Sequence, residues 1–257
     1  MRIHPKGESL GHEWLVAAVF LSAISVGATA TQSREPTTPT TPFALVQPAR
    51  RSSDAPLMPP EPLPPAAHRI TPMAFDIVVR SRSQAGASTI TRQRVTRTAE
   101  RIHIDDGAGR EWLFERNPVD PRRVSGSAIY HAAREIVVYQ ESEVRNTLGI
   151  SGWADVLMPG IRAGQIREMK PTRQARTIGG LRFVRFTALD PRGATKEAWW
   201  NEDEVLSAGV VSSSGAMSVE MSLERLIAVV QPELLRAPAM RFPSYRQIDF
   251  PDSLERH

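Results

Sequence analysis

Side chains that ligate metals are sparse and scattered in this sequence. Beyond residue 30 the histidines are His68, His103, His131 and His257. No two of them have the H-x-x-x-H spacing that places two imidazoles on one helical face as zinc ligands. A lone histidine on a strand is most simply a surface or packing residue, so the sequence predicts no metal site.

Catalytic nucleophiles and acid pairs receive no better support. Serine is plentiful, but "VSGSA" and "GISGW" do not match the G-x-S-x-G nucleophile elbow. Acidic residues group at Glu202–Glu204 and at Asp105–Asp106, where turns are expected, and "DDGAGREWLFER" lacks the alternating oxygens and final Glu of a calcium loop. Nothing selects one carboxylate pair for glycoside hydrolysis. We therefore expect neither enzymatic activity nor a cofactor.

Arginine is the one charged residue type that concentrates locally. Arg80, Arg82, Arg92 and Arg94 lie in a stretch without any acid between Asp76 and Glu100. Within each pair the two side chains share a face, so pairing of the two strands would gather all four into an anion patch. Solvated charge on an outer face is the simpler alternative. In an exported protein such a patch favours contact with anionic lipid and not with nucleic acid.

The elements that would position these residues are mostly strands. "MAFDIVVRSRS" (73–83) alternates apolar and polar residues, as a half-buried strand does. "STITRQRVTRTAERIHI" (88–104) is rich in β-branched residues, and "DDGAG" (105–109) predicts a hairpin before "REWLFER". Gly179–Gly180 predicts another hairpin. Without βαβ alternation, we expect a mainly β fold: one long, antiparallel, strongly curved sheet of about ten or eleven strands.

One segment breaks this rhythm. Ser142–Ile161 carries Leu148, Trp153, Val156 and Leu157 at loosely helical spacing, punctuated by glycine and proline. We expect two short helical turns that cover one face of the sheet, with Trp153 at the entrance of an apolar cavity. The expected lining of this cavity is Phe75, Ile77, Val79, Trp112, Phe114, Trp153, Leu157 and Trp199. Side chains alternate along a strand, so only one of Trp199 and Trp200 can face inward, and the sequence does not decide which.

The leading residues have the features of an export signal. Arg2 and Lys6 precede the apolar run Leu15–Val26, and Ala28-Thr29-Ala30 fits a signal peptidase site. We expect residues 1–30 to be a cleaved signal peptide, which leaves no membrane-spanning segment. The run of about twelve apolar residues falls short of the roughly 20 that a spanning helix needs. With no cysteine in the chain, a lipid-modified Cys and disulfides are excluded.

Domain organisation follows from composition. Residues 31–70 are rich in proline and poor in bulky apolar residues, which predicts a disordered linker, although "PPEPLPP" (59–65) could also dock in a groove. Residues 71–236 can form one curved β domain with a single core. Residues 237–257 are expected to be an irregular extension whose Phe242, Tyr245 and Phe250 pack back on the domain.

Together these features resemble the periplasmic lipoprotein-carrier (Lol) fold. The resemblance is carried by the export signal, the opening "FDIVVRSR", a helical break with Trp before "PGI", the hairpin "TIGGLRFVRF" and the strand "EAWWN". It implies a half-barrel with short helical covers, a periplasmic location and an apolar cavity that binds an acyl chain, a lipoprotein or an apolar protein segment. The Pro-rich linker and the Arg-rich second strand depart from that pattern. The alternative is an envelope interaction protein with a filled core, which binds a protein partner through its linker or tail.

Overall fold

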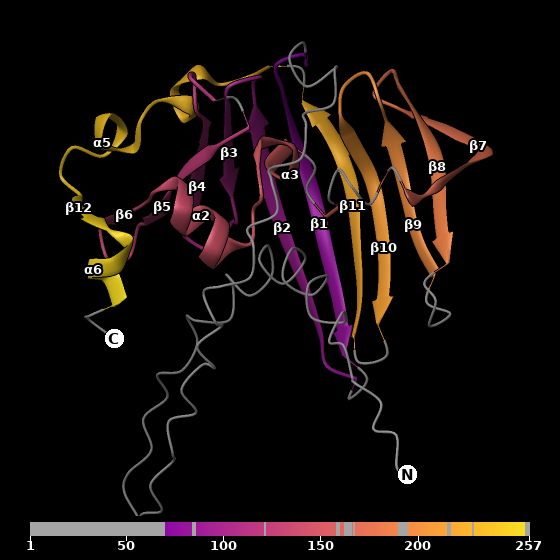
Figure 1. The fold of residues 1–257 in the computed structure, drawn as a ribbon, viewed down its shortest axis with the longest axis horizontal. Coiled ribbons are helices and arrows are strands. Elements are labelled where there is room, and N and C mark those ends of the chain that lie inside the picture. The colour runs from indigo at the N-terminus through magenta and orange to yellow at the C-terminus, as the bar shows by residue number, and fades with distance from the viewer. Residues whose placement is uncertain are drawn as a thin grey trace, which may run out of the picture.

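A single mixed sheet dominates the computed structural model, which describes residues 70–83, 86–120, 122–157, 160–161, 166, 168–189, 195–214, 217–227 and 229–254 (Figure 1). The expected signal peptide and linker, residues 1–69, lie outside the described residues. The strands are β1 (Met73–Ser83), β2 (Ser88–Arg97), β3 (Arg101–Asp105), β4 (Arg110–Arg116), β5 (Val124–Tyr130), β6 (Glu135–Tyr139), β7 (Lys170–Ile178), β8 (Leu181–Leu189), β9 (Thr195–Asn201), β10 (Leu206–Ser214), β11 (Met217–Ile227) and β12 (Arg246–Asp249).

The sheet consists of two meanders joined at their ends. Its 12 strands run in the order β12-β6-β5-β4-β3-β2-β1-β11-β10-β9-β8-β7. The first meander runs from β1 to β6 and the second from β7 to β11, and β1 pairs with β11 in the middle. Because β12 and β7 form the two edges, the curved sheet is unclosed. This confirms the mainly β, strongly curved, antiparallel half-barrel expected from the sequence.

The count of strands exceeds the expectation because the stretch 88–104 is not one strand. It divides into β2 and β3 at residues 98–100, where the Thr98 and Arg101 backbones pair. The Thr98 hydroxyl accepts hydrogen bonds from the backbone N–H of Glu100 and of Arg101, which gives the chain a turn without glycine or proline. β12 is the other additional strand, in a tail that was expected to be irregular.

The glycine-marked hairpins lie where the sequence predicts them. Gly107 and Gly109, at positive φ, connect β3 to β4, and the Asp105 carboxylate accepts the Gly107 N–H at 2.8 Å. Gly179 and Gly180 connect β7 to β8 with φ of 56° and 83°. Positive φ carries little steric cost for glycine, which explains why these two turns were readable from sequence alone.

Two short helices lie on one face of the sheet, as expected from the helical spacing (Figure 1). α2 (Glu141–Leu148) packs Val144 close to Gly126 of β5 and the Phe114 ring of β4. α3 (Trp153–Leu157) follows it, and Gly160 just beyond lies against Met221 of β11. We call this side of the sheet the inner face and the opposite side the outer face. Among the described residues, no helix is long and apolar enough to cross a membrane.

The C-terminal tail passes from β11 to the far edge of the sheet, at β6 (Figure 1). It contains a 3-10 turn, η3 (Pro232–Leu235), then α5 (Pro238–Arg241), β12 and α6 (Phe250–Leu254). Phe242 and Tyr245 contact the His131 ring edge-on at 5.2 and 5.9 Å between ring centroids, and Phe250 stacks on Tyr139 of β6 at 4.7 Å. The three aromatic residues of the tail therefore pack back on the domain, as the sequence indicated.

Candidate functional site

The inner face carries a continuous apolar surface. Directly paired residues share a face, and the register aligns Phe75 with Val95, Val95 with Ile104, and Ile104 with Trp112. Five of the six strand residues expected to line a cavity are thereby brought together, and the sixth, Trp199, is not. Their exposed fractions are 1% for Phe75 and Ile77, 2% for Val79 and Phe114, and 4% for Trp112. The face is therefore covered in this structure.

Trp153 and Leu157 belong to α3 and are both 0% exposed. The Trp153 backbone N–H donates to the Arg122 carbonyl at 3.1 Å, which fastens the start of α3 to the loop before β5. Trp153 is thus part of the cover, as expected, but its side chain lies beneath the cover and not at an exposed rim. Its indole N–H is buried and has no hydrogen-bond partner among the described residues.

The two tryptophans of β9 point to opposite faces, and Trp200 is the inner one. Ala198 aligns with Val210, Val210 with Met221, and Met221 with Val79, so Ala198 is on the inner face and Trp200, two residues on, shares it. Trp200 is 6% exposed. Trp199, which the sequence analysis placed in the cavity lining, instead lies on the outer face, where the Arg176 guanidinium sits 4.4 Å from its ring centroid.

A cation is buried beneath α3. Arg97 of β2 is 1% exposed and donates to the carbonyl oxygens of Leu157 at 3.4 Å, Val205 at 3.0 Å and Glu204 at 2.5 Å. Burial lowers the pKa of Arg97 to about 10, which leaves it charged at neutral pH. Its Nε is buried, and no described residue provides it with a hydrogen-bond acceptor. Arg97 therefore ties the end of the cover to the β9–β10 turn through neutral acceptors.

The same turn is strained. Val205 has a φ of 49°, which β-branched residues rarely adopt, and its side chain is fully buried. The Asn201 side chain accepts the Glu204 N–H at 2.7 Å, and the Glu204 carboxylate accepts the Thr71 hydroxyl at 2.7 Å. The sequence analysis identified neither Arg97 nor this turn as part of a site. The sequence signal that could have identified this site is Arg97 itself, a long charged residue at a strand position whose neighbours on the same face are apolar.

The four arginines of the anion patch do share the outer face, but three of them lie next to carboxylates. Arg94 lies 2.9 Å from Asp76, Arg80 4.0 Å from Glu220, and Arg92 3.9 Å from Glu224. The hydrogen bond from Arg94 lowers the pKa of Asp76, which also accepts from Arg225 at 2.6 Å. Arg82 is exposed and has no ion pair within the described part of the chain.

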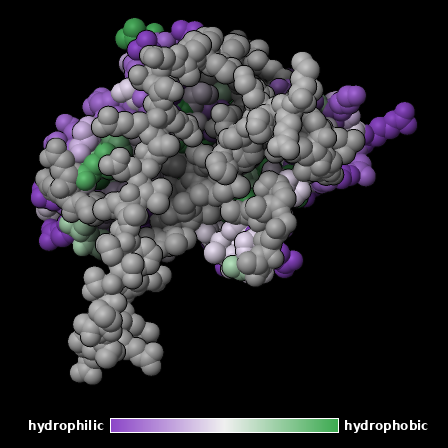
Figure 2. Space-filling view, turned by 60° about the horizontal axis from the view of Figure 1, so that its bottom comes forward, coloured by the Kyte–Doolittle hydropathy of each residue, from purple (hydrophilic) through white to green (hydrophobic). Residues whose placement is uncertain are grey.

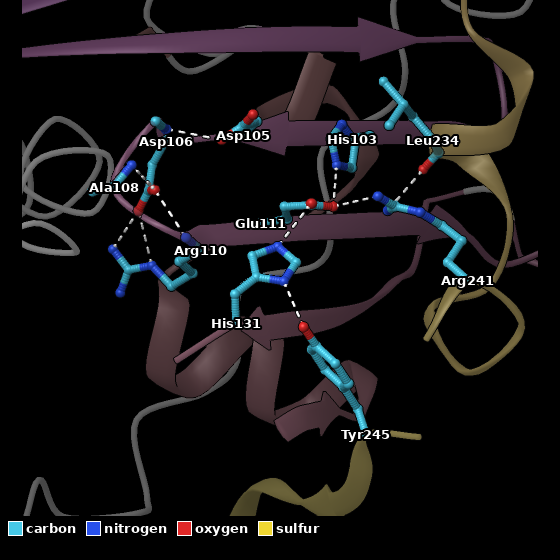
Figure 3. A network of polar contacts seen from close by, with 11 residues as sticks. His103, Asp105, Asp106, Ala108, Arg110, Glu111, His131, Leu234, Arg241 and Tyr245 are labelled. Atoms are coloured by element: carbon cyan, nitrogen blue, oxygen red, sulfur yellow. Dashed lines mark hydrogen bonds and ion pairs between the residues drawn. The ribbon is translucent and has the colours of Figure 1, made fainter. Parts of the chain in front are cut away.

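A polar network on the outer face escaped the sequence analysis (Figure 3). Glu111 of β4 accepts from His103 Nε2 at 2.7 Å, His131 Nε2 at 2.9 Å and Arg241 Nη2 at 2.5 Å. His131 Nδ1 lies 3.0 Å from the Tyr245 hydroxyl. Burial alone would raise the pKa of Glu111, but the hydrogen bonds and charges of His103 and Arg241 lower it to about 2. The ionised carboxylate only accepts, so both histidine Nε2 atoms donate to it.

This network fastens the tail and shows no sign of a metal site. Arg241 and Tyr245 come from the tail, whereas Glu111, His103 and His131 come from the sheet and its loops. Within the described ranges, no group of three or more metal-ligating side chains is suitably placed. Hydrophilic residues dominate the described surface visible in Figure 2, where hydrophobic residues show as separate small groups.

Comparisons with known proteins give structural likenesses only. No family model matches the chain, and no curated protein does. The solved structure of PNGF-II matches 69% of this chain and 31% of its own, with 13% identity and a TM-score of 0.38. A DUF1329 family protein from Desulfovibrio piger matches 67% of this chain and 92% of its own, with 8% identity and a TM-score of 0.36.

A LolA superfamily protein from Nitrosomonas europaea is also similar, as the sequence resemblance implied. The match covers 67% of this chain and 94% of that one, with 10% identity and a TM-score of 0.24. The chain spans only about a third of PNGF-II, since 31% of that protein is matched. All three TM-scores lie below 0.5, so these likenesses carry no argument about function here.

Proposed function

We propose that this protein is an exported, periplasmic, non-catalytic binding module whose inner face holds an acyl chain, a lipoprotein or an apolar protein segment. The observation that carries the proposal is the run of large apolar side chains across neighbouring strands, on a face that carries only two short helices among the described elements. Burial of apolar surface is favourable by about 25 cal/mol per Å², so this face must stay covered, and we propose that a ligand can replace part of its present cover. The export signal expected at residues 1–30 supports the location.

Access to the inner face would require the cover to move. Arg97 holds the Leu157 carbonyl at the end of α3 and two carbonyls of the β9–β10 turn. Only the longest of these bonds, at 3.4 Å to Leu157, joins Arg97 to α3, so release of α3 would leave the two bonds to the β9–β10 turn in place. The strained Val205 turn lies at the same place.

The proposal is tested by titrating a fluorescent fatty-acyl probe into the full chain. We expect saturable binding, with an affinity that changes in Trp153→Ala. Trp199→Ala is the matched control, because it removes the same side chain from the outer face. Two results would contradict the acyl-binding proposal. One is that both substitutions change the affinity for the probe equally, and the other is that the wild type does not bind the probe.

The near-zero exposure of the inner face favours a second candidate function. Phe75, Ile77, Val79, Phe114 and Trp112 are all at most 4% exposed. If side chains alone achieve this, the protein has a filled core, and it binds an envelope protein through its linker or tail. Thermal unfolding separates the two: a large loss of stability in Trp153→Ala together with no probe binding by the wild type selects the filled core.

A further inference from the structure

The tail is attached to the sheet in two unlike parts. We call residues 232–245 the root and residues 246–254 the tip. The root is bound through buried or charged hydrogen bonds: Arg101 donates to the Leu235 carbonyl at 2.8 Å, and Arg241 pairs with Glu111 while their side chains are 11% and 14% exposed. Charge-assisted hydrogen bonds of this kind are roughly twice as strong as neutral ones. The root therefore stays in place.

The tip is bound more weakly. β12 adds four residues to the edge of β6, and it does so in parallel, whereas all the other described strand pairs are antiparallel. Parallel pairing is slightly less stable per residue. Of the β12 side chains only Ile248 is buried, and α6 has no buried residue. The ion pair between Arg246 and Glu135 is partly exposed, and solvent screening leaves such a pair only a small net contribution.

The surface beneath the tip is apolar and leads inward. Ile248 lies beside Val137 of β6, and Phe250 stacks on Tyr139. Tyr139 contacts Trp112 at 5.4 Å between ring centroids, and Trp112 stacks on Phe114 at 5.6 Å. Burial raises the pKa of Tyr139, as expected of a phenol in an apolar surrounding. Removal of the tip would expose both a strand edge and an aromatic end of the inner face, so this surface requires a cover.

We propose that the β6 edge is a docking site for an extended segment of a partner protein, and that the chain's own tip occupies this site in the structure. The tip defines the chemistry of the segment. By analogy with the tip, the segment carries two apolar side chains two positions apart, which correspond to Ile248 and Phe250. A basic residue two positions before the first of them corresponds to Arg246 and faces Glu135. The segment runs parallel to β6 and is recognised by strand addition. The site does not require that the inner face holds an acyl chain.

A foreign segment can gain contacts that the tip does not make. The β12 register ends where Asp249 pairs with Val138, although β6 continues to Tyr139. The tip turns there into α6, and Pro251 has no N–H to extend the ladder. A second copy of this chain would bring the same proline and gain nothing over the intramolecular tip, whose effective concentration is on the order of millimolar. A partner strand that stays extended opposite Tyr139 would gain the ladder contact at that residue, which is how it displaces the tip. Gln140, the next residue, already bonds within the α2 cap.

Strand addition in trans tests the site with the full chain. Ile248→Asp weakens the tip, and a fluorescent peptide with the sequence of residues 244–254 serves as the probe. We expect the peptide to bind the Ile248→Asp protein at least about tenfold more tightly than the wild type, because the intramolecular competitor is weakened. A peptide with Pro251→Thr should bind more tightly still, and a peptide with Ile248→Asp should not bind. Gln247→Ala, at an exposed position of β12, is the control protein and should behave as wild type.

Each other outcome overturns the proposal. If folded Ile248→Asp protein does not bind the peptide, or if the wild type binds it equally well, the β6 edge is not the docking site. If the Pro251→Thr peptide binds no better than the natural sequence, or cross-linking shows that wild-type copies exchange tips, the occupant is a second copy and not a partner. Should Ile248→Asp fail to fold, Phe250→Ala is used in the same assay with the same criteria. Because no fatty-acyl probe is present, failure here leaves the acyl-binding proposal standing, and the reverse also holds.

Discussion

Replacement of Glu111 by Gln should remove a pH-dependent part of the protein's stability. The pKa of Glu111 is lowered from 4.5 to about 2 by its contacts with His103 and Arg241, although burial opposes this. At 1.36 kcal/mol per pKa unit the shift corresponds to roughly 3 kcal/mol. Because His131 leaves one side of the network partly in contact with solvent, we discount this to about 2 kcal/mol.

The sign of the effect follows from linkage. The folded-state pKa is depressed, so the stabilisation is fully present above the unfolded-state value of 4.5 and is lost as the pH falls towards about 2. We expect urea unfolding to give a difference of about 2 kcal/mol between the wild type and Glu111→Gln at pH 7, declining steadily below pH 4.5. Other carboxylates, such as Asp76, titrate in both proteins and cancel in the difference.

Two further measurements fix the interpretation. Glu115→Gln is the matched control, since Glu115 lies on the same strand face but forms a surface ion pair with Arg101, worth about 1 kcal/mol at most. Hydrogen exchange at residues 241–245 should accelerate in Glu111→Gln alone, because Glu111 fastens Arg241. A stability difference that is the same at pH 7 and pH 3 would show that the carboxylate charge does not contribute, and the reasoning would fail.

Two other substitution sets give sharp contrasts. Gly179→Ala should destabilise the protein by about 1–3 kcal/mol more than Gly180→Ala does, as measured by thermal or urea unfolding. Both glycines have positive φ, but a Cβ at Gly179 would lie 2.5 Å from Leu226 Cδ1, whereas a Cβ at Gly180 would meet open space. Equal losses would exclude the Leu226 contact as the cause. Replacing the four arginines of the anion patch with Gln should weaken sedimentation with anionic vesicles at low salt, and added salt should mimic this. Arg82→Gln alone should reproduce most of the loss, since the other three face carboxylates. Unchanged sedimentation of the quadruple variant counts against a lipid contact.

The parts of the fold that were predictable depend on neighbours in sequence. Alternation along residues 73–83 gives a strand and its two faces, and glycines mark turns that need positive φ. The break at Thr98 was not predictable, because a hydroxyl group replaces the usual glycine or proline signal. β12 was missed for a different reason: it is four residues long, and mostly exposed.

The polar sites were not predictable because their members are far apart in sequence. Arg241 and Glu111 are separated by 130 positions, and Arg97 and Val205 by 108. No local spacing rule connects them, and Arg97, Glu111 and Arg241 are ordinary surface types when read alone. The inner-face lining was predictable up to the strand register, which alone assigns Trp200 to the inside and Trp199 to the outside.

The pairing of β1 with β11 imposes an order of events on folding. Asp76 and Arg225, which meet across this pair, are 149 positions apart. During synthesis β1 can pair with β2 at once, but its other edge has no neighbour until nearly the whole domain has been made. Such distant pairings close slowly, and an open strand edge in the interim invites association with other chains. A chain that stops before β11 would therefore hold a complete first meander whose unprotected edge lies at the centre of the intended sheet.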